Sequence, residues 1–138
     1  MPHKKPVQFL LKCDPAGRHF YAVEVHPTKT SMLRAVQRLG APRKHSLDSR
    51  AVCLRFELKN PHPEHEQIGT IFFTRKDAGV EVVMHELVHA ACGWARKVGI
   101  QPVGEHKKFR YVDDPEERFA SCLQYMVRQF YCQPIPTN

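Results

Sequence analysis

The 138-residue sequence lacks a long apolar segment, and its N-terminus lacks the features of an export signal. A helix needs about 20 consecutive apolar residues to cross a bilayer, and the apolar runs of this chain are far shorter. The first six residues, Met-Pro-His-Lys-Lys-Pro, carry positive charge, but no apolar segment of the signal-peptide type follows them. We therefore expect a cytoplasmic protein that does not partner a membrane.

Cysteine pairs with metal-binding or disulfide spacing are also missing. The five cysteines are odd in number, and no two of them stand in a C-x-x-C arrangement. This pattern argues against both a zinc ribbon and a disulfide framework. We expect free thiols that are buried as small apolar groups. The cysteines are Cys13, Cys53, Cys92, Cys122 and Cys132.

Acidic residues are scarce in the first half of the chain. Residues 1–69 contain twelve Lys or Arg against six Asp or Glu, a net charge of +6, whereas residues 70–138 contain nine against eight, a net charge of +1. Such an excess is typical of a solvated face, and the alternative is a surface for nucleic acid or an acidic partner. Its main members are Lys29, Arg34, Arg38, Arg43, Lys44 and Arg50.

The order of the apolar patterns predicts an α+β fold in a single domain, residues 1–138. Alternating runs between turn signals predict four strands, and apolar residues three and four positions apart predict three helices. We expect a small, twisted, mostly antiparallel sheet. Residues 1–67 form its basic β/α part and residues 68–133 a metal-binding core. The predicted strands are 8–13, 19–26, 51–58 and 68–74, and the predicted helices are 30–39, 80–98 and 115–131.

The helix predicted over residues 80–98 contains His85-Glu86-Leu87-Val88-His89, an H-E-x-x-H motif. Because a helix repeats every 3.6 residues, His85 and His89 project from one face, where both imidazoles can bind one Zn²⁺. Glu86 is then placed as the general base for a water whose pKa the metal lowers to about 7. The plainer alternative is an ordinary helix that happens to carry two histidines. The motif in its helical setting favours a zinc metallopeptidase that acts on a peptide or protein.

Capping residues mark the ends of the predicted helices. Thr30 or Ser31 begins the first helix, and Asp77 is the expected N-cap of the motif helix. A glycine, Gly99, follows the last turn of the motif helix. In the C-terminal helix Asp114 is the expected N-cap, with Pro115 at the first helical position.

A catalytic zinc ion needs a third protein ligand, and two adjacent glutamates compete for that role. Glu117 stands three residues after Asp114, in the capping-box position, where it reaches back to the backbone. Glu116 shares a stripe with apolar residues of the same helix, which predicts that it is buried beside the metal. We therefore expect His85, His89 and Glu116 as metal ligands, with Glu117 and His106 as the alternatives. Tyr111 and His106 are candidates to stabilise an oxyanion.

Three segments carry a resemblance to a known family. The first is Gly69-Thr-Ile-Phe-Phe-Thr, the second is Val83-Met-His-Glu-Leu-Val-His-Ala-Ala, and the third is Pro115-Glu-Glu-Arg-Phe-Ala-Ser-Cys-Leu-Gln-Tyr-Met. Together they resemble small phage-encoded H-E-x-x-H metallopeptidases and, more distantly, peptidases of the ImmA/IrrE type. The resemblance implies a minimal gluzincin-like core in which a second helix donates a glutamate. It also implies that the strand at residues 68–74 is the edge along which a peptide lies extended.

A second resemblance rests on His85-Glu-Leu-Val-His-Ala and on the later segment His106-Lys-Lys-Phe109. Both are similar to parts of SprT-like proteases, which act near DNA, and the basic first half would suit that role. A different class is also compatible with these residues. It is a metal-stabilised binding or anti-defence module that contacts nucleic acid or a host protein without turnover.

Overall fold

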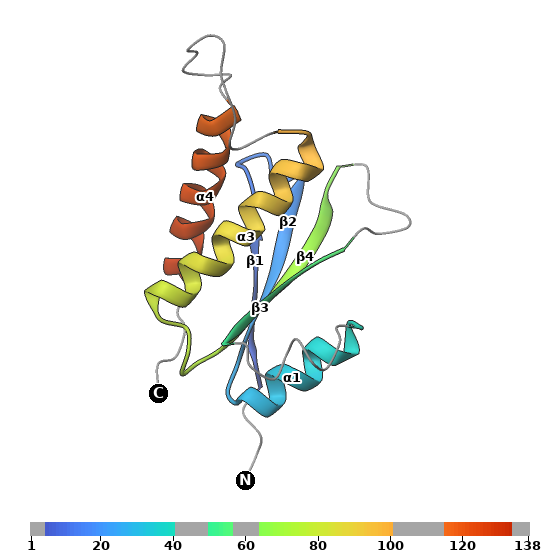
Figure 1. Ribbon diagram of the computed structural model, residues 1–138, viewed down its shortest axis with the longest axis vertical. Helices are drawn as coiled ribbons and strands as arrows, with labels where there is room; N and C mark the ends of the chain where they lie inside the picture. Colours follow the sequence, from blue (N-terminus) through green and yellow to red (C-terminus); the bar gives the residue numbers. More distant parts are fainter. Residues whose placement is uncertain (1–4, 41–49, 57–63, 101–114, 134–138) are drawn as a thin grey trace.

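The computed structural model describes residues 5–40, 50–56, 64–100 and 115–133 of the chain. Four strands and three helices lie in these ranges (Figure 1). The strands are β1 (Val7–Lys12), β2 (His19–His26), β3 (Ala51–Arg55) and β4 (Glu66–Thr74). The helices are α1 (Lys29–Arg38), α3 (Val80–Val98) and α4 (Pro115–Tyr131).

The four strands form one mixed sheet in the order β1-β2-β4-β3. β1 pairs antiparallel with β2, β3 pairs antiparallel with β4, and the central pair β2–β4 is parallel. The expected α+β class and the mostly antiparallel pairing are therefore confirmed. β4 lies between β2 and β3, so the basic first part of the chain and the motif-bearing part share the same sheet.

Helices cover both faces of the sheet because side chains of a strand alternate between its faces. On one face, α1 buries Met32 and Val36 against Phe72 of β4. On the other face, Ile71 and Phe73 of β4 join the larger apolar core with α3 and α4. α4 also covers the β1 side of the sheet, where the Gln129 side chain bonds both the Lys12 N–H and the Lys12 carbonyl, at 2.9 and 2.7 Å.

Tyr21 fixes the height of α3 above the sheet. Its side chain is fully buried, and its hydroxyl donates a hydrogen bond of 2.8 Å to the Ala90 carbonyl of α3. Two glycines make room for the ring: a Cβ on Gly69 would lie 2.7 Å from the Tyr21 ring, and a Cβ on Gly93 would collide with the hydroxyl. The motif helix is therefore positioned, just beyond His89, by a contact between two layers.

The structure corrects two of the predicted helix caps. α1 begins one residue earlier than expected, and its N-cap is Thr28, whose hydroxyl accepts from the Ser31 N–H at 3.1 Å. α3 spans the expected residues, but its N-cap is Gly79, with no side-chain cap. The Asp77 carboxylate does not cap the helix. It accepts a hydrogen bond of 3.2 Å from the Thr74 hydroxyl, within the turn that follows β4. Gly99 ends α3 in the left-handed conformation, as expected.

All five cysteines are free thiols, as the sequence predicts. Cys13 and Cys122 are buried and Cys53 and Cys92 are half-buried, but the expected burial is wrong for Cys132, which is exposed near the end of α4. Among the described residues, no helix is long and apolar enough to cross a membrane.

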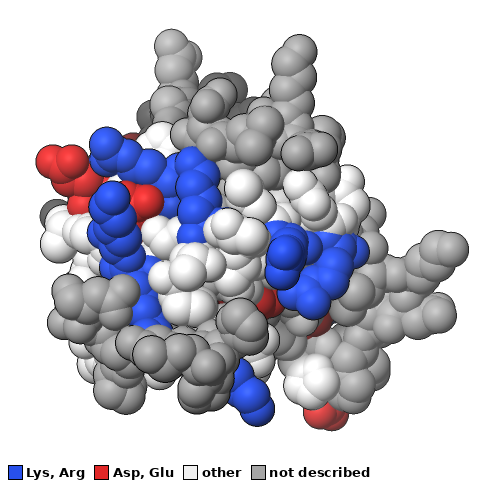
Figure 2. All heavy atoms as spheres, turned by 90° about the horizontal axis from the view of Figure 1, so that it is seen from below, with Lys and Arg blue, Asp and Glu red and all other residues white. Residues whose placement is uncertain are grey.

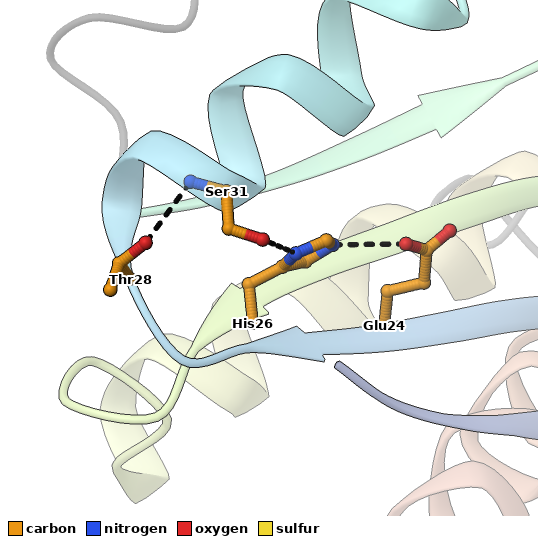
Figure 3. Close-up of polar contacts among 4 residues, drawn as sticks. All are labelled: Glu24, His26, Thr28 and Ser31. Atoms are coloured by element: carbon orange, nitrogen blue, oxygen red, sulfur yellow. Dashed lines mark hydrogen bonds and ion pairs between the residues drawn. The ribbon is translucent and has the colours of Figure 1, made fainter. Parts of the chain in front are cut away.

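A buried histidine joins the end of β2 to α1 (Figure 3). His26 is 1% exposed, its Nδ1 lies 2.7 Å from the Ser31 hydroxyl, and its Nε2 lies 2.9 Å from a Glu24 carboxylate oxygen. One neutral tautomer satisfies both contacts, since Nε2–H donates to Glu24 while Nδ1 accepts from Ser31. Burial lowers the pKa of His26 below its ordinary value of 6.5, although the bond to Glu24 acts in the opposite direction.

This lowered pKa predicts acid sensitivity. Because the unfolded chain takes up a proton at His26 more readily than the folded chain, the free energy of unfolding should fall as the pH decreases below about 6.5. The His26→Gln variant should show a shallower fall between pH 7 and 5, measured by urea unfolding at several pH values. His19, whose pKa burial also lowers, contributes with the same sign and provides the matched variant His19→Gln. An unchanged pH profile in both variants would contradict this prediction.

Candidate metal centre

The two motif histidines converge on one point in front of α3. Both side chains are exposed, their ring centroids are 4.7 Å apart, and their Nε2 atoms are 3.1 Å apart. A tetrahedral zinc ion with Zn–N distances of about 2.05 Å holds two nitrogens about 3.3 Å apart. The pair His85 and His89 therefore fits a shared zinc ion. Burial lowers the pKa of His89, as do the neighbouring His85 and Arg55, so its imidazole is favoured in the neutral form that binds metals.

Glu86 occupies a core position of α3. The buried face of this helix recurs at Val83, Leu87, Ala90 and Trp94, and Glu86 lies on it with only 7% of its surface exposed. A carboxylate is rarely placed among apolar side chains without a partner or a role. Burial raises the pKa of Glu86, and the neighbouring His85 acts against this rise. Burial raises the pKa of Cys53 to about 12, and the nearby Glu86 adds to this rise.

His85, Glu86 and His89 line one open cavity of about 950 Å³ between α3 and strand β3. β3 and the preceding Arg50 form one wall, and Glu81 and Val82 of α3 complete the lining. The cavity therefore brings together the three motif residues that the sequence singles out.

β3 presents an unpaired edge beside this cavity. β3 pairs antiparallel with β4, and just beyond the strand the Phe56 N–H donates a hydrogen bond of 3.0 Å to the Ile68 carbonyl. In an antiparallel pair, opposite residues alternate between hydrogen-bonded and non-hydrogen-bonded pairs. The main-chain groups of Val52 and Leu54 therefore point to β4, while those of Cys53 and its neighbours two residues away point outward. β3 has β4 as its single neighbour within the described sheet.

The strand expected at the sheet edge is not the one that lies there. The resemblance implied that residues 68–74 form the peptide-binding edge, but they belong to β4, which is paired on both sides. The physical reason is the chain path: after β2 the chain passes through α1 to β3 at the edge, and β4 then pairs between β2 and β3. β3, which precedes β4 in the chain, is the edge beside the motif.

Glu116 is not buried, contrary to the sequence prediction. It lies in the first turn of α4 and is exposed, as is Ala120 of the same stripe. The face of α4 that enters the core is centred on Cys122, Met126 and Phe130. The buried face of α4 is thus rotated by part of a turn from the predicted one. The apolar residues of the predicted stripe still pack against the core, namely Phe119, Leu123 and Val127, but Glu116 does not.

The start of α4 also lies away from the histidine cavity. Glu117 lines a different cavity, together with Trp94 of α3 and the turn that joins β1 to β2. In the described ranges, no three His, Cys, Asp or Glu side chains form a group that could hold a metal. The structure therefore brings His85, Glu86 and His89 together and does not bring Glu116 to them. His106, Tyr111 and Asp114 lie outside the described residues.

The basic residues of the first half separate into two places. Lys29, Arg34 and Arg38 are exposed on α1, which has no acidic residue in its first turn and lies on the face of the sheet opposite α3. Figure 2 shows Lys and Arg side chains on the side of the molecule where α1 lies, with fewer Asp and Glu. Arg50 is the described member of this group that lines the histidine cavity, and Arg43 and Lys44 lie outside the described residues.

Comparison of the chain with protein-family models, curated proteins and solved structures finds no significant match. Function is therefore inferred from the geometry of the cavity and the chemistry of its residues.

Two features beside the histidines were not predicted from the sequence. Arg55 of β3 is exposed in the cavity, and Gly93, which lines a smaller cavity together with Arg55, lies one turn beyond His89 on α3. The spacing of His85, His89 and Gly93, each four residues apart, was a visible signal that one face of the helix stays open past the histidines.

Proposed function

We propose that the protein is a zinc-dependent metallopeptidase that hydrolyses peptide bonds. The observation that carries this proposal is the pair of Nε2 atoms 3.1 Å apart, at the spacing of two zinc ligands, in the same cavity as the buried carboxylate of Glu86. Apolar packing does not explain this arrangement, because both histidines are exposed and Glu86 occupies a core position.

His85 and His89 would hold the metal through Nε2. Bound Zn²⁺ would supply Lewis-acid polarisation of a peptide carbonyl and acidify a water molecule. Glu86 would accept a proton at its carboxylate and return it to the leaving amine, a role that suits a carboxyl group whose pKa is raised by burial. The third protein ligand is open: Glu116 and Glu117 lie away from the histidine cavity, and His106 is the remaining candidate from the sequence.

The unpaired edge of β3 would hold the substrate. An extended peptide that pairs with the outward main-chain groups around Cys53 lies in the same cavity as the histidines. Main-chain hydrogen bonds of this type bind peptides with little dependence on sequence. The opposite edge of the sheet is less available, because Gln129 occupies both main-chain groups of Lys12.

Metal content and hydrolysis together test this proposal. We expect about one zinc ion per chain by mass spectrometry of the metal, and cleavage of a quenched-fluorescence peptide library that a chelator stops and added zinc restores. His85→Ala and His89→Ala should each weaken zinc binding by more than about a hundredfold, because each removes a direct ligand.

The matched control is His65→Ala, which removes an exposed histidine that does not line the cavity and should leave zinc binding unchanged. A wild-type protein without stoichiometric zinc would contradict the proposal. Zinc binding without any chelator-sensitive cleavage would instead indicate the metal-stabilised binding module.

A further inference from the structure

We infer that Arg55 binds a carboxylate group of the substrate peptide, one helix turn beyond the histidine pair. This inference rests on the proposed peptidase function and adds a preference for acidic substrates. It starts from the stripe of α3 that faces β3. His85, His89 and Gly93 follow one another at intervals of four residues and so lie along one face of the helix.

Gly93 leaves this stripe open for the Arg55 side chain. A Cβ at position 93 would lie 2.5 Å from Cδ of Arg55 and 3.3 Å from its Cγ. The aliphatic stem of Arg55 therefore crosses α3 at the place where a side chain of residue 93 would stand. A glycine inside a helix is less favourable than alanine, and here it admits both Arg55 and the Tyr21 hydroxyl.

The charge of Arg55 is available to a ligand. The residue is exposed, and it forms no ion pair with any carboxylate in the part of the chain that the structure describes. Its charge reaches the metal site, since it is one of the groups that lower the pKa of His89, after burial and His85. Arg55 also lines the smaller cavity next to Gly93, so it borders both cavities.

A carboxylate is the ligand that this position favours. A guanidinium presents a planar fork of donors that matches the two oxygens of a carboxylate. One turn of helix separates His89 from Gly93, a rise of about 6 Å. A carboxylate on Arg55 therefore lies within one or two residues of a peptide carbonyl at the histidine pair. The carboxylate can belong to an Asp or Glu side chain or to the C-terminus of the peptide.

Peptide binding without turnover tests the inference. Labelled octapeptides with one glutamate moved through the internal positions, each matched by its glutamine version, are titrated into the Glu86→Gln protein by fluorescence anisotropy. Each peptide is made with a free and with an amidated C-terminus. We expect one position of the glutamate, or the free C-terminus, to strengthen binding about tenfold, and Arg55→Gln to remove that gain.

Arg50→Gln is the matched control, because Arg50 is an exposed arginine that lines the same cavity and directly precedes the other end of β3. An equal loss in the Arg50 and Arg55 variants would mean general attraction of negative charge and would overturn the inference, as would binding that ignores the carboxylates. Dependence on the glutamate identifies a side-chain carboxylate, and dependence on amidation identifies the C-terminus. Either result supports the role of Arg55.

The titration is run on zinc-loaded and on chelator-treated protein. If the wild type binds no zinc, the proposed function fails while the Arg55 effect is still measured on the metal-free protein. If zinc binds but Arg55→Gln changes no peptide affinity, the inference alone fails.

Discussion

Replacing Glu86 with glutamine should reduce hydrolysis about a thousandfold while zinc remains bound. Glutamine keeps the shape of the side chain but cannot accept a proton, and general-base catalysis typically contributes factors of this size. The loss corresponds to about 4 kcal/mol of transition-state stabilisation. The measurement is kcat/KM on a peptide selected from the library, beside the zinc content of each protein.

Stability gives a second measurement on the same variant. Glu86 is buried, and burial penalises its charged form, so a neutral amide should not lower the melting temperature. Glu81→Gln is the matched control, since Glu81 is an exposed glutamate on the same helix beside the same cavity. It should keep both zinc and activity. Full activity in the Glu86→Gln protein would refute the assignment of Glu86 as the base.

Replacing Gly69 with alanine should destabilise the protein by about 3 kcal/mol. The added Cβ would collide with the Leu54 carbonyl of β3 and would lie 2.7 Å from the Tyr21 ring. Neither neighbour can yield easily, because the first is backbone in the β3–β4 ladder and the second is a buried ring held by its bond to Ala90. For a chain of this size the melting temperature should fall by roughly 10 °C.

Gly69→Ala should also displace the proposed metal ligands, because it moves β3 and Tyr21, and both contact α3. We expect weaker zinc binding in the Gly69→Ala protein at temperatures where it is still folded. Gly79→Ala is the control, since a Cβ at Gly79 meets nothing within 4 Å and its φ of −77° suits any residue. It should change the free energy of unfolding by about 1 kcal/mol at most. Equal melting temperatures for the two variants would contradict the packing argument.

Features that depend on nearby residues followed from the sequence. The bounds of α3 and the convergence of His85 and His89 on one face are consequences of helical periodicity, which acts over a few residues. The hairpin of β1 and β2 follows from alternation around a turn, and the free cysteines follow from their spacing. The position of Glu86 beside the histidines is part of the same local pattern.

Features that depend on distant residues did not follow. A stripe of apolar residues predicts the buried face of α4 only to within part of a turn. Glu116 lies in the first turn at the border of this face, and it is exposed in the structure. The caps of α1 and α3 depend on which turn residues hydrogen-bond to one another, as the bond between Thr74 and Asp77 illustrates.

By itself, the sequence determined the α+β class, the motif helix and the placement of His85 and His89 on one face with Glu86 beside them, because each depends on residue patterns within single elements. The tertiary structure alone decided which strand stands at the edge. It placed β4 inside the sheet, β3 beside the motif, and Arg55 across Gly93. The reason is that strand order and contacts between layers are set by the crossover through α1 and by the close approach of Tyr21 to two glycines. No pattern of neighbouring residues records these contacts.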